Sequence, residues 1–235
     1  MCDSLLSVKI MLDKLFKRNR ENNDPFRAQG KEDKLIAALL NLEKSGFYID
    51  VGAHHPIALS NTYYLYQAGW RGICIEPNED LIDYYKQHRP HDIIYNIAVA
   101  SFEGEADFYL GQYDVHSSLQ ENENTNVSRR KVSVRRLDNI LEERGQSNEI
   151  DLLSVDTEGT EVDVLEGLNL YKNRPRLILA EYNTADRANS DLQPYLIEKG
   201  YQVIFVNKWN ILFARDFSQS AIHLYNKVDI SIRSL

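Results

Sequence analysis

Four apolar runs of this chain each end in a carboxylate, and this pattern constrains the fold more than any other. The four acidic residues are Asp50, Glu76, Asp156 and Glu181. Stretches with helical periodicity separate the runs, which predicts βαβ units and a parallel sheet. In an open sheet of this kind, ligands bind beyond the carboxyl ends of the strands. The sequence therefore predicts an α/β fold with an acidic pocket at that edge, suited to a cationic ligand that carries hydroxyl groups.

The end of the chain departs from this alternation. Residues 201–206 and 211–214 are rich in β-forming side chains and flank a short polar loop, which predicts an antiparallel hairpin. The segment 101–149 is long for a connection, and its polar part, 111–130, is interpreted as a mobile lid or a disordered insertion. Strands are predicted at 47–51, 71–75, 92–99, 106–110, 132–134, 150–155 and 176–181, and helices at 31–44, 60–68, 78–88, 161–167 and 189–199.

Three parts of the chain are expected. They are an N-terminal helical extension (1–45), a ligand-binding domain (46–216) and a C-terminal tail (217–235). Residues 4–18 have one apolar helical face, which fits packing on the domain, a homodimer contact or an anchor on a membrane surface. Residues 19–30 are interpreted as a linker.

Composition narrows the classes of partner and compartment. The net charge of −8 argues against a broad nucleic-acid-binding surface. No apolar run approaches the ~20 residues that cross a bilayer, and the start lacks the features of a secretory leader. Two cysteines, Cys2 and Cys74, do not make a disulfide framework. These observations predict a cytoplasmic protein without a transmembrane segment or a nucleic-acid partner.

The turn after the first strand keeps only one glycine, Gly52, of the G-x-G-x-x-G dinucleotide pattern. The missing glycines weaken a pyrophosphate cradle, and Asp50 would repel phosphate but attract an ammonium or sulfonium group. Glu76 lies 24 residues after Gly52, where an acidic residue usually accepts the hydroxyls of a ribose. Asn96 and the apolar residues 97–99 are candidates for an adenine contact, with ordinary core as the alternative.

The densest acidic cluster is residues 156–161. Asp156 at a strand tip can take a substrate proton, hold a cationic amine or bind a metal. Together with Glu181 and Asn183 it offers three oxygen ligands at adjacent strand ends, which predicts a possible Mg²⁺ site. Glu158 and Glu161 belong to the acidic cluster, but they also fit the first turn of a helix, where the dipole favours acidic residues.

Histidines supply the remaining candidates for acid–base chemistry. His54 and His55 lie in the glycine turn and His116 lies in the long polar segment. A histidine near a transferred group can act as a general base at neutral pH, whereas a loop histidine can also be plain polar surface.

Two ordered blocks of the sequence resemble one family. The first comprises residues 48–56 (YIDVGAHHP), 60–66 (SNTYYLY), 69–72 (GWRG) and 75–78 (IEPN), and the second comprises 150–161 (IDLLSVDTEGTE) and 164–167 (VLEG). They are similar to the FkbM-type S-adenosylmethionine-dependent methyltransferases over about residues 45–215. At the turn, residues 54–56 (HHP) stand where the family often has Asn-x-Gly.

The resemblance implies a Rossmann-like class I methyltransferase fold. Its sheet has seven mostly parallel strands, an antiparallel C-terminal hairpin and helices on both faces. It also implies S-adenosylmethionine as methyl donor and a hydroxyl acceptor on a sugar, glycan or natural product. By position, the methionine part of the donor would contact Asp50, Gly52 and Ala53. The ribose would contact Glu76, and the adenine would contact Ala98.

The full set of site residues follows from this resemblance and from the residue chemistry. The cofactor contacts are Asp50, Gly52, Ala53, Asn61, Glu76, Pro77, Ala98 and Asp156; the catalytic candidates are Asp156, Glu181 and His55; the acceptor contacts are His54, His116, Ser118, Glu158 and Asn183. Two alternative functions stay open. One is an NAD(P)-dependent oxidoreductase on a similar sheet, and the other is a non-catalytic binding module with a methyltransferase-like fold.

Overall fold

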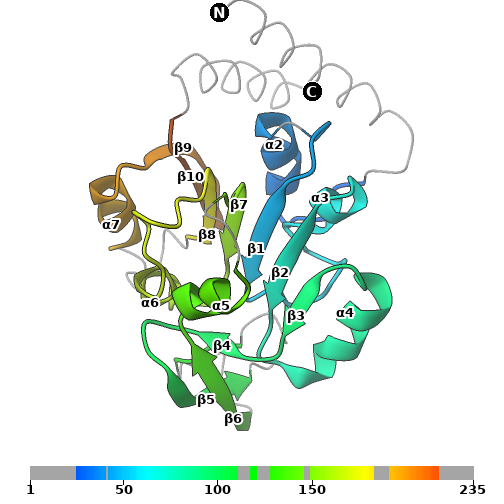
Figure 1. Cartoon of the computed structure of the whole chain (residues 1–235), viewed down its shortest axis with the longest axis vertical. Coiled ribbons are helices and arrows are strands. Elements are labelled where there is room, and N and C mark those ends of the chain that lie inside the picture. The colour runs from blue at the N-terminus through cyan, green and yellow to red at the C-terminus, as the bar shows by residue number, and fades with distance from the viewer. Residues whose placement is uncertain are drawn as a thin grey trace, which may run out of the picture.

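A seven-stranded sheet forms the centre of the described part of the molecule (Figure 1). The computed structural model describes residues 25–40, 42–110, 117–120, 128–145, 149–182 and 191–216. The strand order is β3-β2-β1-β7-β8-β10-β9, and β10 runs antiparallel to β8 and β9 while the other pairs are parallel. The strands are β1 (Phe47–Val51), β2 (Arg71–Ile75), β3 (Ile93–Tyr95), β7 (Leu152–Val155), β8 (Leu177–Glu181), β9 (Gln202–Val206) and β10 (Asn210–Ala214).

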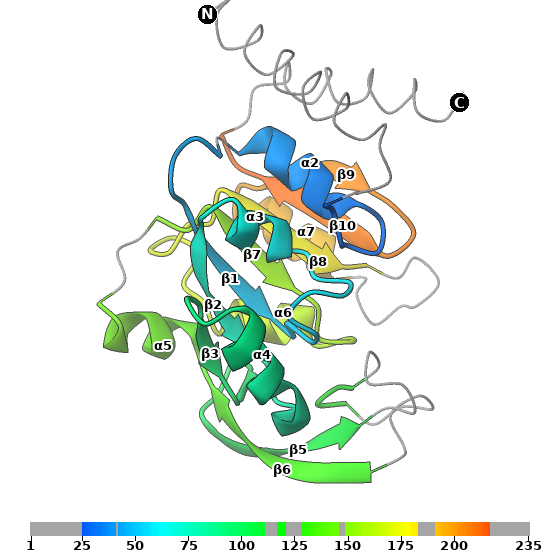
Figure 2. The same ribbon diagram turned by 90° about the vertical axis from the view of Figure 1, so that its right-hand side faces the viewer.

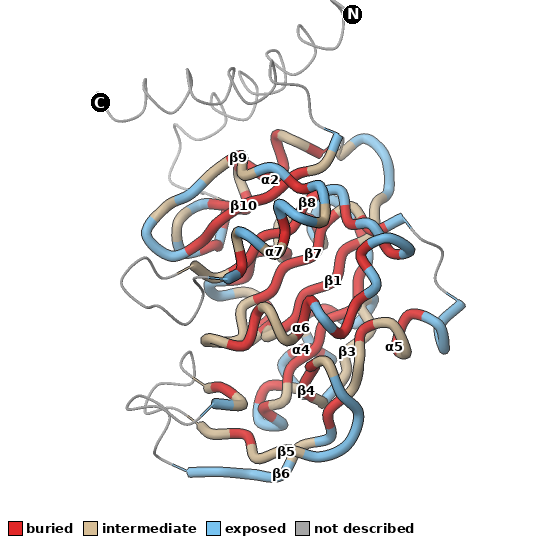
Figure 3. Tube along the Cα trace, turned by 90° about the vertical axis from the view of Figure 1, so that its left-hand side faces the viewer, coloured by how far each residue is buried: buried red, intermediate tan, exposed pale blue. Residues whose placement is uncertain are grey.

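Helices cover both faces of this sheet, because successive strand residues point to opposite sides. Ile49 and Val51 of β1 pack in one core cluster with residues of α5, α6 and α7. Tyr48 packs in a second cluster with residues of α2, α3 and α4. The central strands are accordingly buried along their length (Figure 3). The helices are α2 (Glu32–Leu39), α3 (Tyr63–Gln67), α4 (Ile82–His88, after the 3₁₀ turn Glu79–Leu81), α5 (Leu137–Glu143), α6 (Glu161–Glu166) and α7 (Leu192–Glu198).

A separate three-stranded sheet corrects the prediction for the middle of the chain (Figure 2). The predicted strand 92–99 is two strands, β3 in the main sheet and β4 (Ala98–Val99) in the small one. Between them, Asn96 turns its amide to the carbonyl oxygens of Glu76 and Pro77 at 2.9 and 3.0 Å, which anchors the chain where it leaves the main sheet. The strands predicted at 106–110 and 132–134 are parts of β5 (Gly104–Leu110) and β6 (Ser128–Arg135), and α5 was not predicted.

The stretch before β1 belongs to the same packed core. The predicted helix 31–44 ends at Leu39, because the backbone of Leu40 is extended. In the expected linker, Phe26 and Ala28 are buried and Ala28 forms a bridge with Leu59. The helix expected at 4–18 and the tail at 217–235 lie outside the described residues. Among the described helices, none has the length and apolar character needed to cross a membrane.

Candidate functional site

The turn after β1 is pressed against the turn after β7. Gly52 has a φ of +71°, and a Cβ atom there would overlap the carbonyl oxygen of Asp156. The N–H groups of Gly52 and Ala53 both donate to the Ile75 carbonyl, at 3.0 and 3.1 Å. The N–H of His54 donates to the Glu76 carboxylate at 2.7 Å. These three donors of the turn are therefore directed into the protein, unlike the N–H groups of a phosphate cradle.

Glu76 joins the first two strands at their carboxyl ends. It follows β2, is 5% exposed, and each of its carboxylate oxygens accepts one backbone N–H, from His54 and from Asn78, both at 2.7 Å. Glu76 also lines the cleft described next, and a carboxylate has about four acceptor positions. The two backbone hydrogen bonds fix the direction of this carboxylate at the cleft wall.

An open cleft of about 1030 Å³, counting space continuous with solvent, lies beyond these strand ends. Its apolar wall comes from the start of the small sheet and includes Ala98, Val99, Phe108 and Leu119. Carboxylates of Glu76, Asp156 and Glu158 lie on other parts of the wall, and no lysine or arginine lines the cleft among the described residues. The cleft thus combines an apolar wall with negative charge.

Three residues of the cleft wall adopt left-handed backbone conformations that non-glycine residues usually avoid. They are His54, Leu59 and Glu158, with φ angles of 46°, 60° and 54°. Such backbone strain costs roughly 1–3 kcal/mol per residue and concentrates at functional sites. Its gathering around one cleft supports a functional role for that cleft.

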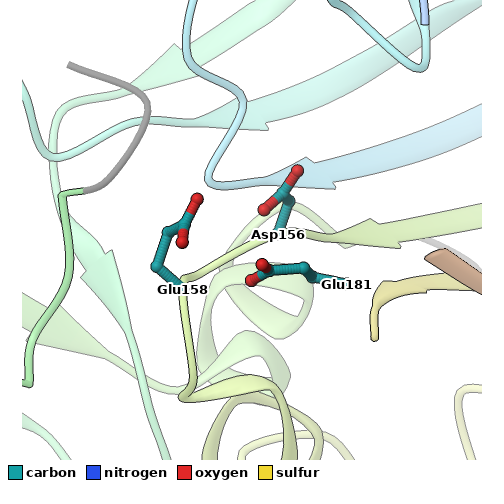
Figure 4. Close-up of side chains that lie close together, drawn as sticks. All are labelled: Asp156, Glu158 and Glu181. Atoms are coloured by element: carbon teal, nitrogen blue, oxygen red, sulfur yellow. The ribbon is translucent and has the colours of Figure 1, made fainter. Parts of the chain in front are cut away.

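Asp156, Glu158 and Glu181 bring three carboxylates together where β7 and β8 end (Figure 4). One oxygen from each lies within 4.8 Å of the others. The backbone N–H of Glu158 donates to the Glu181 carboxylate, which draws the two strand ends together. Two of the three ligands predicted for Mg²⁺, Asp156 and Glu181, therefore converge. Asn183 lies outside the described residues.

Burial and mutual repulsion change the protonation of this acidic trio. Burial, followed by the charge of Asp156, raises the pKa of Glu181 to about 10. Burial, followed by the charge of Glu158, raises the pKa of Asp156 well above its ordinary value. Like charges this close in a shielded site do not all ionise together. The trio therefore retains at least one proton at neutral pH in the absence of a cation.

Two further side chains hold the acidic turn in place. Glu161, the first residue of α6, accepts the N–H groups of Thr157 and Gly159 at 3.0 and 3.2 Å. The hydroxyl of Ser118 lies 3.1 Å from the carbonyl oxygens of both Thr157 and Glu158, and can donate its one proton to either. Ser118 thereby fastens the segment after β5 to the turn that carries Glu158.

Asp50 does not line the cleft, because its side chain lies on the face of β1 opposite to that of its neighbour Val51, which does. It is 3% exposed and accepts the Thr62 hydroxyl at 2.5 Å. Arg89, which is 1% exposed, donates to the same Thr62 hydroxyl at 3.0 Å and forms an ion pair with Asp92 at 2.8 Å. Burial raises the pKa of Asp50, while the Arg89 charge opposes this rise. Asp50 is therefore a member of a buried polar network behind the turn.

His55 also stabilises the turn, from the side away from the cleft wall. Its Nδ1 accepts the N–H groups of Ile57 and Ala58 at 3.1 and 2.9 Å, and the residue is not on the cleft wall. Burial, followed by the charge of His88, lowers the pKa of the imidazole. A neutral ring that accepts two backbone N–H groups shapes the loop that carries Leu59.

Comparison with known proteins places the chain in a family. The profile of the methyltransferase FkbM domain matches residues 50–203, which is more than half of the chain. The chain belongs to the FkbM methyltransferase family. This confirms the resemblance and, at the level of the family, S-adenosylmethionine as the methyl donor. A search of curated protein sequences finds no significant match.

Solved structures similar to this FkbM-family chain are distant in sequence. A methyltransferase FkbM from Methylobacillus flagellatus is 16% identical, with a TM-score of 0.49; the match covers 72% of this chain but only 43% of that one. A TehB-like methyltransferase from Corynebacterium glutamicum is 13% identical (TM-score 0.45; 90% and 99% covered). A didemethyltoxoflavin N1-methyltransferase from Burkholderia thailandensis is 11% identical (TM-score 0.43; 92% and 89% covered).

Most of the site residues predicted for this FkbM-family chain meet at the cleft. Glu181 lies next to the cleft wall, in the acidic trio with Asp156 and Glu158. Asp50 and His55 lie behind the turn. His116 and Asn183 are outside the described residues. Those on the wall are Gly52, Ala53, His54, Asn61, Glu76, Pro77, Ala98, Ser118, Asp156 and Glu158.

Sequence reasoning missed other parts of the wall. Gln29 comes from the expected linker, Phe108 from the small sheet and Asn210 from the hairpin. Asn210 donates to the buried carboxylate of Glu32 at 2.8 Å, so the hairpin and α2 meet at the cleft edge. The sequence predicted the strand 106–110 that carries Phe108 and the hairpin that carries Asn210, but not that either residue reaches the cleft.

Proposed function

We propose that this protein is an S-adenosylmethionine-dependent O-methyltransferase whose acceptor is a hydroxyl of a sugar, glycan or natural product. The observation that carries the proposal is that the turn's N–H groups donate to the Ile75 carbonyl and the Glu76 carboxylate, so these donors are already used within the protein. A cleft with carboxylates and without a described lysine or arginine favours a sulfonium over a pyrophosphate. The same observation weighs against the NAD(P)-dependent alternative.

The residues present fit the donor. The Glu76 carboxylate on the cleft wall is a strong acceptor for ribose hydroxyls, and the Ala98–Phe108 side of the cleft provides apolar surface for the adenine. Gly52 and Ala53 border the part of the cleft nearest Asp156, where the methionine part would lie. When bound, the donor supplies a methyl group on a positively charged sulfur, already a strong electrophile. The protein's task is then to orient the acceptor hydroxyl and take its proton.

Asp156 is the proposed general base, with Glu158 and Glu181 as its neighbours. The shared proton, with the raised pKa values of Asp156 and Glu181, makes the trio a strong proton acceptor once one carboxylate ionises. A sulfonium nearby favours that ionisation because opposite charges stabilise each other. Orientation of the two reactants in a closed site contributes up to roughly 7–11 kcal/mol of barrier reduction. His54 and Leu59, on the strained rim, are proposed acceptor contacts.

The magnesium prediction stays a prediction and has a direct test. If a divalent cation occupies the trio, Mg²⁺ should raise the melting temperature of the wild type but not that of Glu181→Gln. An equal response of both proteins would remove Mg²⁺ from the proposal and leave the trio as a proton acceptor alone.

The proposal is tested in two steps. Calorimetry compares S-adenosylhomocysteine with NADH, and only the first should bind. An isotope-labelled methyl transfer assay then scans sugars, glycans and polyketide-like natural products with the wild type and with Asp156→Asn. Incorporation that is lost in Asp156→Asn, while this variant still binds S-adenosylhomocysteine, supports the assignment. Donor binding without incorporation into any acceptor would favour the non-catalytic binding module.

A further inference from the structure

A second cavity lies at the opposite end of the main sheet. Its lining residues precede the parallel strands or follow the antiparallel one, so they gather at the amino ends of β1, β2, β7 and β8. Its volume is about 760 Å³ by the measure used for the cleft. A five-residue strand is about 15 Å long, which separates this cavity from the methyltransferase site. The lining comprises Lys44, Ser45, Trp70, Glu149, Ile150, Asp151, Arg174, Arg176 and Arg215.

Two buried N–H donors at this cavity have no acceptor. Among the described residues, three buried side-chain polar atoms have no hydrogen-bond partner: Trp70 Nε1, Arg215 Nε and Glu161 Oε2. The first two belong to residues that line the cavity, and Trp70 is only 2% exposed. An unsatisfied buried donor costs about 1–3 kcal/mol, so two at one cavity indicate that an acceptor belongs there.

The charges around the cavity specify the kind of acceptor. Four cations meet two carboxylates, in a chain whose net charge is −8. Asp151 is already committed, since its oxygens accept the Phe47 N–H at 3.1 Å and the Arg176 guanidinium at 2.9 Å. Glu149 is exposed at the rim. Among the described residues, Lys44 and Arg174 have no ion pair, and the only ion pair of Arg215 is with the exposed Asp216, at 3.4 Å.

We propose that this basic cavity binds a phosphate-class oxyanion, either free or carried by a phosphorylated small molecule. Arginine guanidinium groups match the geometry of phosphate oxygens, and an indole N–H can only donate. An oxyanion would accept from Trp70 Nε1 and Arg215 Nε and neutralise the excess positive charge. The site is independent of methyl transfer, because it lies at the far end of the strands.

Trp70 offers a direct readout. The chain has two tryptophans, and Trp209→Phe leaves Trp70 as the one that reports the cavity. In this background, inorganic phosphate and a sugar phosphate should each change the Trp70 fluorescence with saturation, whereas sodium chloride at equal ionic strength should not. The tighter of the two ligands identifies the source of the phosphate group. Calorimetry with S-adenosylhomocysteine should give the same affinity with and without phosphate.

Variants of the cavity and a matched control complete the experiment. Arg174→Gln/Arg215→Gln should abolish the saturable signal, whereas Lys172→Gln, which removes a cation paired with Glu142 outside the cavity, should not. Trp70→Phe removes the N–H donor together with part of the indole ring, and it should weaken phosphate binding about tenfold, measured by thermal shift. Phosphate titrations in both cavity variants that match the control, or a chloride response equal to that of phosphate, would overturn the proposal.

Discussion

The replacement Glu76→Gln tests the central element of the donor site. Both carboxylate oxygens accept a backbone N–H at 2.7 Å, and the residue is 5% exposed. An amide keeps one acceptor oxygen and places an NH₂ group opposite one of these donors. Losing one hydrogen bond to a charged group lowers the free energy of unfolding by about 1.5–3 kcal/mol. The same loss of charge on the cleft side weakens ribose binding.

The expected result is a roughly 30- to 150-fold loss of S-adenosylhomocysteine affinity, since about 2–3 kcal/mol separates a carboxylate from an amide as partner of two hydroxyls. Calorimetry measures the affinity, and circular dichroism confirms the fold. Glu79→Gln is the matched control. This carboxylate lies three positions further along, pairs with Arg130 at the surface and is 67% exposed. It should bind like the wild type.

A ligand that lacks one ribose hydroxyl separates a direct contact from a loosened turn. If Glu76 accepts that hydroxyl, the wild type should bind 2′-deoxy-S-adenosylhomocysteine more weakly than S-adenosylhomocysteine. Glu76→Gln should bind the two ligands almost equally, because coupled losses are not additive. Additive losses would mean that Glu76 only holds His54 and Asn78 in place. Unchanged affinity in a folded Glu76→Gln variant would refute the pocket assignment altogether.

Four other predictions follow from the same geometry. Gly52→Ala should lower the free energy of unfolding by roughly 2–5 kcal/mol in urea titrations, through its left-handed backbone and its overlap with Asp156. Asp50→Ala should lower it by roughly 3 kcal/mol, because Arg89 stays buried with one carboxylate fewer; an unchanged midpoint would contradict the network. The folded state keeps a proton on Glu181 that the unfolded chain loses above its ordinary pKa. The melting temperature of the ligand-free protein should therefore fall as the pH rises from 5 to 9, and fall less in Glu181→Gln. The affinity ratio of S-adenosylmethionine to S-adenosylhomocysteine should rise with pH, about tenfold for each unit by which the sulfonium lowers the pKa of the trio, and a flat ratio would place the sulfonium elsewhere.

The sequence predicted the main sheet well, because its strands are continuous apolar runs with clear boundaries. Alternation of strands and helices gave the parallel part, and the polar loop between two β-rich runs gave the antiparallel β9–β10 pair. The small sheet was harder. β4 has only two residues, and it is held by pairing with β6, about 36 residues away along the chain. No local pattern records such a distant partner.

The position of Asp50 away from the cleft wall has a simple geometric origin. The sequence placed a carboxylate at the carboxyl end of β1, which is correct along the strand, but side chains alternate between the two faces. Asp50 shares its face with Tyr48, and Arg89 and Thr62 approach from that side. Glu76 escapes this ambiguity because it follows its strand, where the chain turns into the cleft. The face to which a strand residue belongs depends on the side chains that pack there. The sequence alone did not show that Arg89 packs on the Asp50 face of β1.

The close contact between two turns couples the proposed donor site to the acidic trio. Gly52 has no room for a side chain against the Asp156 carbonyl, so the turn after β1 and the turn after β7 cannot move independently. Glu161, at the start of α6, and Ser118, in the segment after β5, hold the second turn in place by hydrogen bonds. A displacement of either turn would move the base relative to the methyl donor. The rate of methyl transfer depends steeply on the alignment of the reacting atoms. Substitutions at Gly52 or Ser118 should therefore lower this rate more strongly than they lower donor affinity.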